Sequence, residues 1–532
     1  MEKTGKKNLL KSGIRLSLLT LISRILGLIR EATKARFLGT SGYADAFGIA
    51  FLIPNLLRRL FAENSISVAF IPTFKGYIEN GKTKEECQEF ISATLSLITF
   101  LTAIVVTLGM FLTPFIVKIF YNGAEAASTG MDIAAETAIL TRIMFPYLLV
   151  ISVAAFFQGV LNGENIFSPS GFTPILFNIS VILGTYILSP HMDNPARAMS
   201  VGVIAGGCIQ AAFQAPFVWK CGWKTSLVSL KKTFSNPGTK QVVALVIPTI
   251  IGMASYQLND LVSTALAGRA GEGIVSSLQY SLRLQELILG IFAVSIGTVI
   301  LPDMSGFASR KEWDKYNDML TSAIKIIALI TIPISFYSLI TGRELISIVY
   351  KSRRFDDNSV QLTLNAFRFH IAGLFFIAAN RIISPAFYAQ GNTKLPTSAG
   401  MISFAVNIVL AFVLSIKWKG SGIAFALSAA SFINTVMLFV FLKKMNTTDV
   451  AKVVKSTLAY SIKMIILSCI ASVPSYFVHR ICAARFSDMG RFAGNGLTIM
   501  ITAACFGICG ILMLVITKDE SAMQIKNKFF RG

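Results

Sequence analysis

Apolar runs long enough to cross a lipid bilayer recur along the whole chain, from Leu16 to Ile516, with short polar stretches between them. A helix needs about 20 mostly apolar residues to span the hydrocarbon core. The chain has 532 residues, of which 54% are hydrophobic and only 14% are charged, whereas soluble proteins carry about 25% charged residues. A soluble chain of this length would also need polar surfaces between several domains. The runs therefore predict an integral membrane protein.

The same runs predict an all-α, polytopic fold with about fourteen transmembrane helices. A membrane β-barrel is not expected, because its strands are short and alternate apolar with polar residues. The predicted spans are 14–38, 46–72, 90–118, 134–160, 169–189, 199–218, 241–268, 274–302, 321–340, 361–389, 396–416, 420–442, 456–478 and 494–516.

A basic polar loop at 219–240 divides the first six spans from the next six. We predict an N-terminal lobe at 12–218, a C-terminal lobe at 241–443 and a separate C-terminal helix pair at 456–516. Two six-helix halves would suit a transporter built from repeats around a site near the bilayer midplane. Identity between the halves is too low to establish a repeat from the sequence.

The net charge of +22 has a different meaning here than in a soluble protein, where it would favour nucleic acid. Most of the excess lies in loops, so we expect no nucleic-acid partner and interpret it as a topology signal. With a cytoplasmic N-terminus, the loops on that side hold about 24 Lys and Arg residues and the other loops about 11. Segment 341–360 is rich in Lys and Arg although this topology places it on the outer side. The overall distribution of Lys and Arg between the loops still predicts that both termini are cytoplasmic.

Charged residues inside the apolar runs are the candidate functional residues, because a charge at the centre of a spanning helix costs about 2.5–3.5 kcal/mol on insertion scales. Arg24 and Arg30 lie in the first span. Arg24 has apolar neighbours on both sides, so a side chain reaching back to the membrane surface explains it poorly.

The second span carries a polar stripe formed by Asn55, Arg59 and Glu63, which are spaced i, i+4, i+8, with Arg58 one position round the helix. Asp45 lies at the start of this span. A structural network of ion pairs between the first two helices is the alternative explanation for Arg59 and Glu63.

The eighth span places Gln279, Arg283 and Glu286 on one face. Arginine does not lose its charge readily, and its planar guanidinium group matches phosphate oxygens with two parallel hydrogen bonds. An interior with more arginines than carboxylates therefore predicts an anionic ligand, and a diphosphate has the right charge and geometry.

Several motifs at these positions resemble the MurJ/MviN family of bacterial lipid II flippases. They follow one another in order over nearly the whole chain: Ser23–Glu31 (SRILGLIRE), Asp45-Ala46-Phe47, Pro54–Ser65 (PNLLRRLFAENS), Phe145-Pro146-Tyr147, Val160–Phe167 (VLNGENIF), Phe172–Asn178 (FTPILFN), Gly290–Pro302 and Phe387–Pro396 (FYAQGNTKLP).

The resemblance implies two six-helix lobes in a V around a central cavity, plus two further helices, as in the MATE-like exporters of the MOP superfamily. It implies transport of lipid II, the undecaprenyl-diphosphate-linked peptidoglycan precursor, across the bacterial inner membrane, with the cell-wall synthesis machinery as a further partner. The family's essential cavity arginines match Arg24, Arg30, Arg58 and Arg283. Its aspartate at the start of the second helix matches Asp45, and its last two helices imply a groove for the lipid tail.

Some family members bind sodium between the seventh and eleventh helices. Asp260 and Asn407 are the candidate sodium ligands here, but Ala411 stands where a carboxylate is expected. We therefore predict no required metal ion and no cofactor, and leave open coupling to the membrane potential or to an ion. The three histidines and seven cysteines show no spacing typical of a metal site.

Other functions remain as alternatives at this point. A flippase for another polyprenyl-diphosphate-linked glycan would need the same arginines. A membrane-embedded enzyme acting on such a lipid would need paired carboxylates or a metal site, and the adjacent acidic pairs Asp356-Asp357 and Glu85-Glu86 have no convergent partners. A scaffold for the cell-wall machinery would not need buried arginines. The sequence thus favours a transporter.

Overall fold

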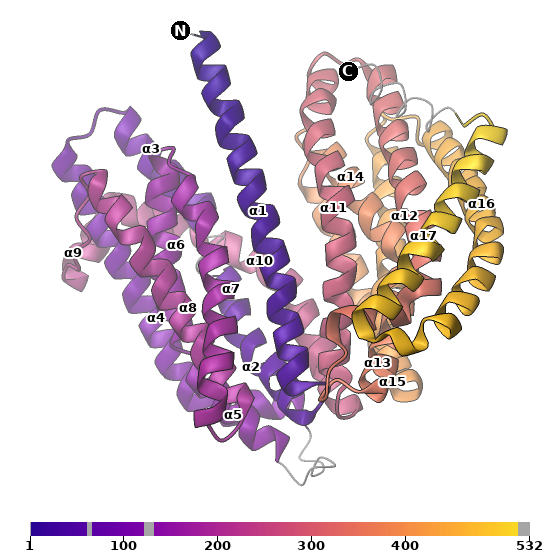
Figure 1. The fold of residues 1–532 in the computed structure, drawn as a ribbon. Helices are drawn as coiled ribbons and strands as arrows, with labels where there is room; N and C mark the ends of the chain where they lie inside the picture. Colours follow the sequence, from indigo (N-terminus) through magenta and orange to yellow (C-terminus); the bar gives the residue numbers. More distant parts are fainter. Residues whose placement is uncertain (1, 61–65, 122–131, 520–532) are drawn as a thin grey trace. The chain divides into compact units, whose positions relative to one another are not determined.

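The structure, a computed structural model, describes the backbone of residues 2–60, 66–121 and 132–519. Every regular element in these ranges is helical (Figure 1). Within the described part, eight helices are long and apolar enough to cross a membrane, or nine if a bent helix pair counts as one span. The predicted all-α, polytopic fold class is thus confirmed.

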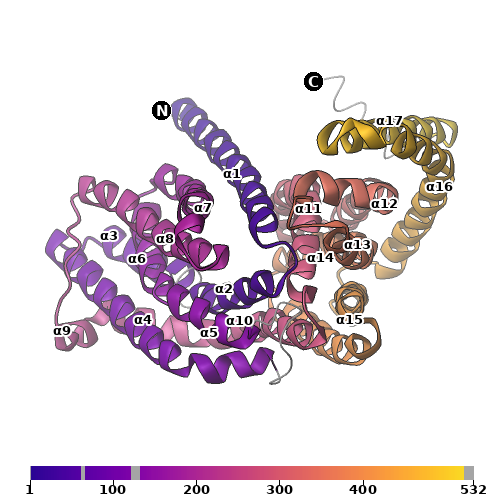
Figure 2. The same cartoon turned by 60° about the horizontal axis from the view of Figure 1, so that its bottom comes forward.

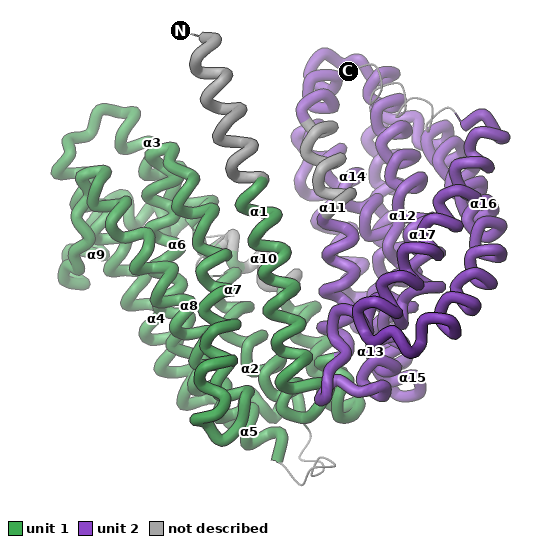
Figure 3. The backbone as a smooth tube through the Cα atoms, in the orientation of Figure 1, with its two compact units in different colours: residues 1–276 green, residues 277–532 purple. Residues whose placement is uncertain are grey.

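The chain divides into two compact units, residues 1–276 and 277–532, shown in green and purple in Figure 3. The first unit contains α1 (Glu2–Leu38), α2 (Gly42–Arg58), η2 (Ile66–Phe70), α3 (Ile71–Glu79), α4 (Lys84–Phe120), α5 (Ile133–Met144), α6 (Tyr147–Gly163), α7 (Ser168–Leu188), η3 (Ser189–His191), α8 (Pro195–Lys220), α9 (Leu230–Ser235) and α10 (Pro237–Ala270).

The second unit contains most of α11 (Ile274–Ser309), followed by α12 (Trp313–Tyr350), α13 (Asp357–Ala372), α14 (Leu374–Tyr388), α15 (Lys394–Lys444), α16 (Val450–Arg485), η4 (Ser487–Met489) and α17 (Arg491–Ile516). The units are defined by packing and place α10 with the first unit. The lobes at 12–218 and 241–443 and the helix pair at 456–516 stay a prediction.

Four of the predicted spans differ from simple helices. The span at 134–160 consists of α5 and α6, which are separated at Phe145-Pro146 because proline has no N–H to continue the helix. The span at 361–389 consists of α13 and α14, with a bend of 43° between them. The spans at 396–416 and 420–442 are joined in α15 through a non-helical residue, Lys419.

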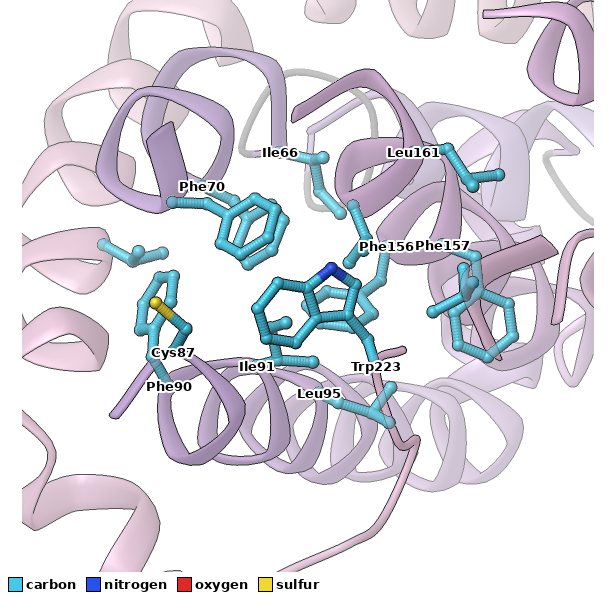
Figure 4. Packing of buried hydrophobic residues seen from close by; sticks show 14 of the residues in the cluster. Ile66, Phe70, Cys87, Phe90, Ile91, Leu95, Phe156, Phe157, Leu161 and Trp223 are labelled. Atoms are coloured by element: carbon cyan, nitrogen blue, oxygen red, sulfur yellow. The ribbon is translucent and has the colours of Figure 1, made fainter. Parts of the chain in front are cut away.

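The first unit is held together by close helix packing and by an aromatic core. α7 and α8 approach so closely that a Cβ atom on Gly184 would lie 2.9 Å from the Cα atom of Gly202, as is typical of small residues between membrane helices. Figure 4 shows the aromatic core, where the indole of Trp223 lies among side chains such as Phe70 and Phe156. The indole N–H donates to Glu164 Oε1 at 2.8 Å, so the chain following α8 is anchored in the core.

Candidate functional site

Arg30 on α1 is held by residues of α7, which packs along α1 (Figures 1 and 2). Its Nη1 donates to Asn178 Oδ1 at 3.1 Å, and its Nη2 to Glu31 Oε1 at 2.8 Å. The Asn178 side chain also donates to the Ser23 carbonyl oxygen at 3.2 Å, and the ring of Phe177 lies 5.6 Å from the guanidinium carbon. α7 thus fixes the orientation of the Arg30 guanidinium group.

Arg24 lies almost two turns before Arg30 on α1 and is half-buried. It forms no hydrogen bond or ion pair with the part of the chain that the structure describes. This guanidinium group lies between apolar neighbours and has no carboxylate partner among the described residues. It is therefore well suited to bind an anionic ligand reversibly.

The two arginines at the end of α2 have different surroundings. Arg58 Nε donates to Asn55 Oδ1 at 3.0 Å, one turn earlier on the same helix. Arg59 Nη1 lies 3.5 Å from Asp260 Oδ2 and 3.4 Å from Gln257 Oε1, both on α10. Arg59 thus has a carboxylate partner on α10, and an ion-pair network between the first two helices stays an alternative explanation for Arg59 and Glu63. The pair of Arg59 and Asp260 is half-exposed and adds little stability.

The end of α2 is also irregular in its backbone. π-helical turns occur at Arg59-Leu60 and at η2, on the two sides of 61–65, and Pro54 lies inside α2. Single π-helical turns within longer helices are frequent at functional sites. Glu63, the third member of the predicted polar stripe, lies outside the described residues.

Asp45 on α2 is 2% exposed, and its carboxylate caps the start of α11. Asp45 Oδ2 accepts from Gly273 N at 2.6 Å, and Oδ1 accepts from Ser276 N at 2.7 Å. In the opposite direction, Glu272 Oε1 accepts from Gly42 N at 2.7 Å, at the start of α2. Each helix start thus receives a carboxylate from the other, which satisfies N–H groups that have no partner within their own helix. This gives Asp45 a structural role, and its contact with substrate stays a prediction.

Arg283 and Glu286 of α11 belong to the second unit. Arg283 Nη1 donates to Glu286 Oε2 at 3.1 Å, in agreement with their predicted common face. On the other side of α11, Ser281 Oγ lies 2.6 Å from His370 Nδ1, and Gln285 Nε2 donates to the His370 carbonyl oxygen. At 100° per residue, Arg283 lies opposite Ser281 and Gln285, so the bonds to α13 keep Arg283 on the face turned away from α13.

The candidate sodium ligands lie on helices of different units. Asp260 on α10 pairs with Arg59, and Asn407 lies in α15 of the second unit, 2% exposed. Ala411, one turn after Asn407, is fully buried and has no oxygen to offer a cation. Within the described residues, no group of three His, Cys, Asp or Glu side chains could hold a metal ion.

Residues that position the arginines were missed from the sequence: Asn178, Gln257, Ser281, Gln285 and His370. Each is a polar residue inside an apolar span, and Asn178 is the last residue of one of the family motifs. Because buried polar groups need hydrogen-bond partners, a polar residue within an apolar span was the sequence signal that could have identified them. Which arginine each of them serves depends on helix packing and could not be predicted.

Comparison with known proteins identifies the family. Residues 34–490 match the family described as "Lipid II flippase MurJ". A protein of Treponema pallidum (strain Nichols) named "Probable lipid II flippase MurJ" is 45% identical over 98% of both chains. A Vibrio cholerae protein of the same name is 32% identical over 82% of this chain and 83% of its own.

Solved structures agree with this result. One described as "Lipid II flippase MurJ, inward closed conformation" has a TM-score of 0.77 at 25% identity, covering 95% of this chain and 99% of its own. An inward-facing multidrug resistance MATE family transporter has a TM-score of 0.66 at 14% identity, covering 83% and 98% of the two chains, and shares the fold. The predicted family is confirmed: the chain belongs to the MurJ family of lipid II flippases.

Proposed function

We propose that this multi-pass membrane protein flips lipid II across the bacterial inner membrane for peptidoglycan synthesis. Family membership supports transport rather than an enzymatic reaction. The observation that carries the site assignment is the excess of cations on the first two helices. Between residues 18 and 60 there are six Lys and Arg side chains and two carboxylates, and one of these carboxylates, Asp45, is used in capping α11.

The diphosphate of lipid II would bind at Arg24, Arg30, Arg58 and Arg283. Its oxygens offer acceptors for guanidinium groups, and its negative charge would offset the repulsion between these arginines in a medium of low dielectric constant. Arg24 has no partner among the described residues, while Asn178 keeps Arg30 oriented. Asn55, Arg59, Glu63 and Glu286 would tune the charge around this site.

Transport would follow alternating access, in which lipid II enters from the cytoplasmic leaflet and leaves to the outer leaflet. Charge neutralisation by the diphosphate would lower the free energy of the occluded state relative to the open states. The pair formed by α16 and α17 would hold the lipid tail, and the cell-wall synthesis machinery would receive the product.

A translocation assay in vesicles containing the purified protein tests this function. We expect transfer of lipid II between leaflets at a rate well above that in protein-free vesicles. The alternative substrate is another polyprenyl-diphosphate-linked glycan, so the head group is varied while the diphosphate is kept. Equal transfer of unrelated glycans would support the broader substrate range instead.

The Lys and Arg bias predicts that the loop at 219–240 is cytoplasmic and that the turn at 417–419 faces the opposite side. Cysteines introduced at Lys232 and Lys417, both exposed, should react with a membrane-impermeant reagent from opposite sides of the inner membrane. Reaction of both positions from the same side would refute the topology.

Sodium should not be strictly required for transport, because Ala411 offers no ligand and Asp260 is paired with Arg59. Replacing all sodium by potassium in the vesicle assay should leave the transport rate within about twofold, since a missing carboxylate removes most of the preference of a site for a hard cation. Loss of transport in potassium would overturn this prediction. A lithium series would then show whether a cation site is present.

A further inference from the structure

The chain between α8 and α10 exposes large apolar side chains next to lysines. Leu227 is 65% exposed, Leu230 40% and Phe234 49%. Lys224, Lys231 and Lys232 are exposed in the same stretch. Exposed apolar side chains are normal on a spanning helix that faces lipid, but this stretch is the predicted basic loop. We call residues 224–235 the basic segment.

The basic segment is held against α4 by hydrogen bonds from one stripe of that helix. Gln88 Oε1 accepts from Lys224 N at 2.8 Å, and Gln88 Nε2 donates to the Lys224 carbonyl oxygen at 2.6 Å. Two turns later, Ser96 Oγ accepts from Val228 N at 2.8 Å. The segment therefore runs along α4, and Figures 1 and 2 both show α9 beside this helix.

These bonds place the basic segment at a definite depth. α4 begins at Lys84 with a capping box formed by Thr83 and Glu86, and its predicted span begins at residue 90. Ser96 lies six residues further, which is about 9 Å along a helix axis. The backbone at Val228 therefore lies beside the first turns of the predicted span of α4, rather than in a loop beyond its end.

The side chains of α9 are arranged as expected for a helix that lies against the protein on one side and against a membrane on the other. Thr233 is fully buried against the protein. Leu230 and Phe234, four residues apart, share the adjacent side of the helix, and Lys231 and Lys232 lie further round. A helix with an apolar side and a Lys-rich side is typical of segments that lie in the plane of the membrane interface.

We propose that the basic segment binds the surface of an anionic bilayer. Leu227, Leu230 and Phe234 enter the boundary between head groups and acyl chains, and Lys231 and Lys232 pair with the phosphates of anionic phospholipids. An acidic protein partner would also meet the lysines, but the depth set by Gln88 and Ser96 gives the apolar side chains access to lipid. The partner surface is therefore the leaflet itself.

The full-length protein tests this in vesicles of phosphatidylcholine with or without phosphatidylglycerol. A spin label is attached to Leu230→Cys, in a protein whose exposed native cysteines, Cys208 and Cys469, are replaced by serine. Its collisions with oxygen and with a water-soluble nickel chelate report its immersion. In anionic vesicles we expect contact with oxygen and protection from nickel, and the opposite for a label at Lys232→Cys.

The charge contribution is tested with Lys231→Gln and Lys232→Gln combined with the label at residue 230. The ratio of immersed to water-exposed label should fall on the order of tenfold in anionic vesicles, because each lysine near such a surface favours binding several-fold. The matched control is Lys417→Gln, an exposed lysine of the second unit, which should change nothing.

Three results would overturn the proposal. The first is access of nickel to the label at residue 230 in both kinds of vesicle. The second is equal immersion in neutral and anionic vesicles, with no effect of the glutamines. The third is protection from both oxygen and nickel, which would mean that protein rather than lipid covers the segment.

Discussion

Alanine at any one of the four candidate arginines should leave a flippase-depleted cell unable to grow, while the protein still reaches the membrane. These residues are Arg24, Arg30, Arg58 and Arg283. Removing one partner of a buried, hydrogen-bonded charge pair costs about 2–5 kcal/mol of binding, which corresponds to a loss of affinity between about 30-fold and several thousandfold. Such a loss would stop lipid II supply at its cellular concentration.

Lysine at the same positions should restore growth only in part. It keeps the positive charge but lacks the planar pair of donors that matches phosphate oxygens. The difference between lysine and alanine therefore separates the requirement for charge from the requirement for geometry. Arg30→Lys should suffer most, because Asn178 orients a guanidinium group through a specific Nη1 contact.

The matched control is Arg36→Ala, in the last turn of α1. Arg36 is exposed and lies over the ring of Tyr186, with 5.8 Å between the guanidinium carbon and the ring centroid, so it should tolerate alanine. Growth is measured after depletion of the native flippase, together with the amount of each variant in the membrane. Normal growth of all four alanine variants would refute the site assignment.

The arginines themselves could be predicted from the sequence, because a charge in a long apolar run is costly and conspicuous. Their partners could not. Arg30 and Asn178 are 148 residues apart, and Arg59 and Gln257 are 198 apart. A bond between two spans depends on which helices pack together and on their rotation, and hydropathy determines neither.

The helical, membrane-spanning character of the chain followed from hydropathy, whereas the helix interruptions did not, and the number of about fourteen spans stays a prediction. Apolar length predicts a span, but the break at Phe145-Pro146 and the π-helical turns on both sides of 61–65 do not change the hydropathy of their spans. Proline gave a signal in the first case. The π-helical turns contain an additional residue per turn, and no particular residue type marks it. These turns could therefore be found only in the structure.

The capping of α11 by Asp45 is the contact that the sequence concealed most completely. The family resemblance selected Asp45 as a residue for substrate, yet its two carboxylate oxygens accept from Gly273 N and Ser276 N. A carboxylate at a helix N-terminus satisfies N–H groups and interacts favourably with the helix dipole. A cap supplied from another helix, 228 residues away, leaves no local sequence pattern such as a capping box.

Asp45→Ala should therefore destabilise the purified protein as well as reduce transport. Alanine would leave two backbone N–H groups buried without an acceptor, at about 1–3 kcal/mol each, so the thermal unfolding temperature in detergent should fall by several degrees. Glu272→Ala removes one acceptor, for Gly42 N, and should lower it by less. An Asp45→Ala protein with unchanged thermal stability and no transport would show instead that Asp45 acts on the substrate, since a lost cap must weaken the fold before it affects transport.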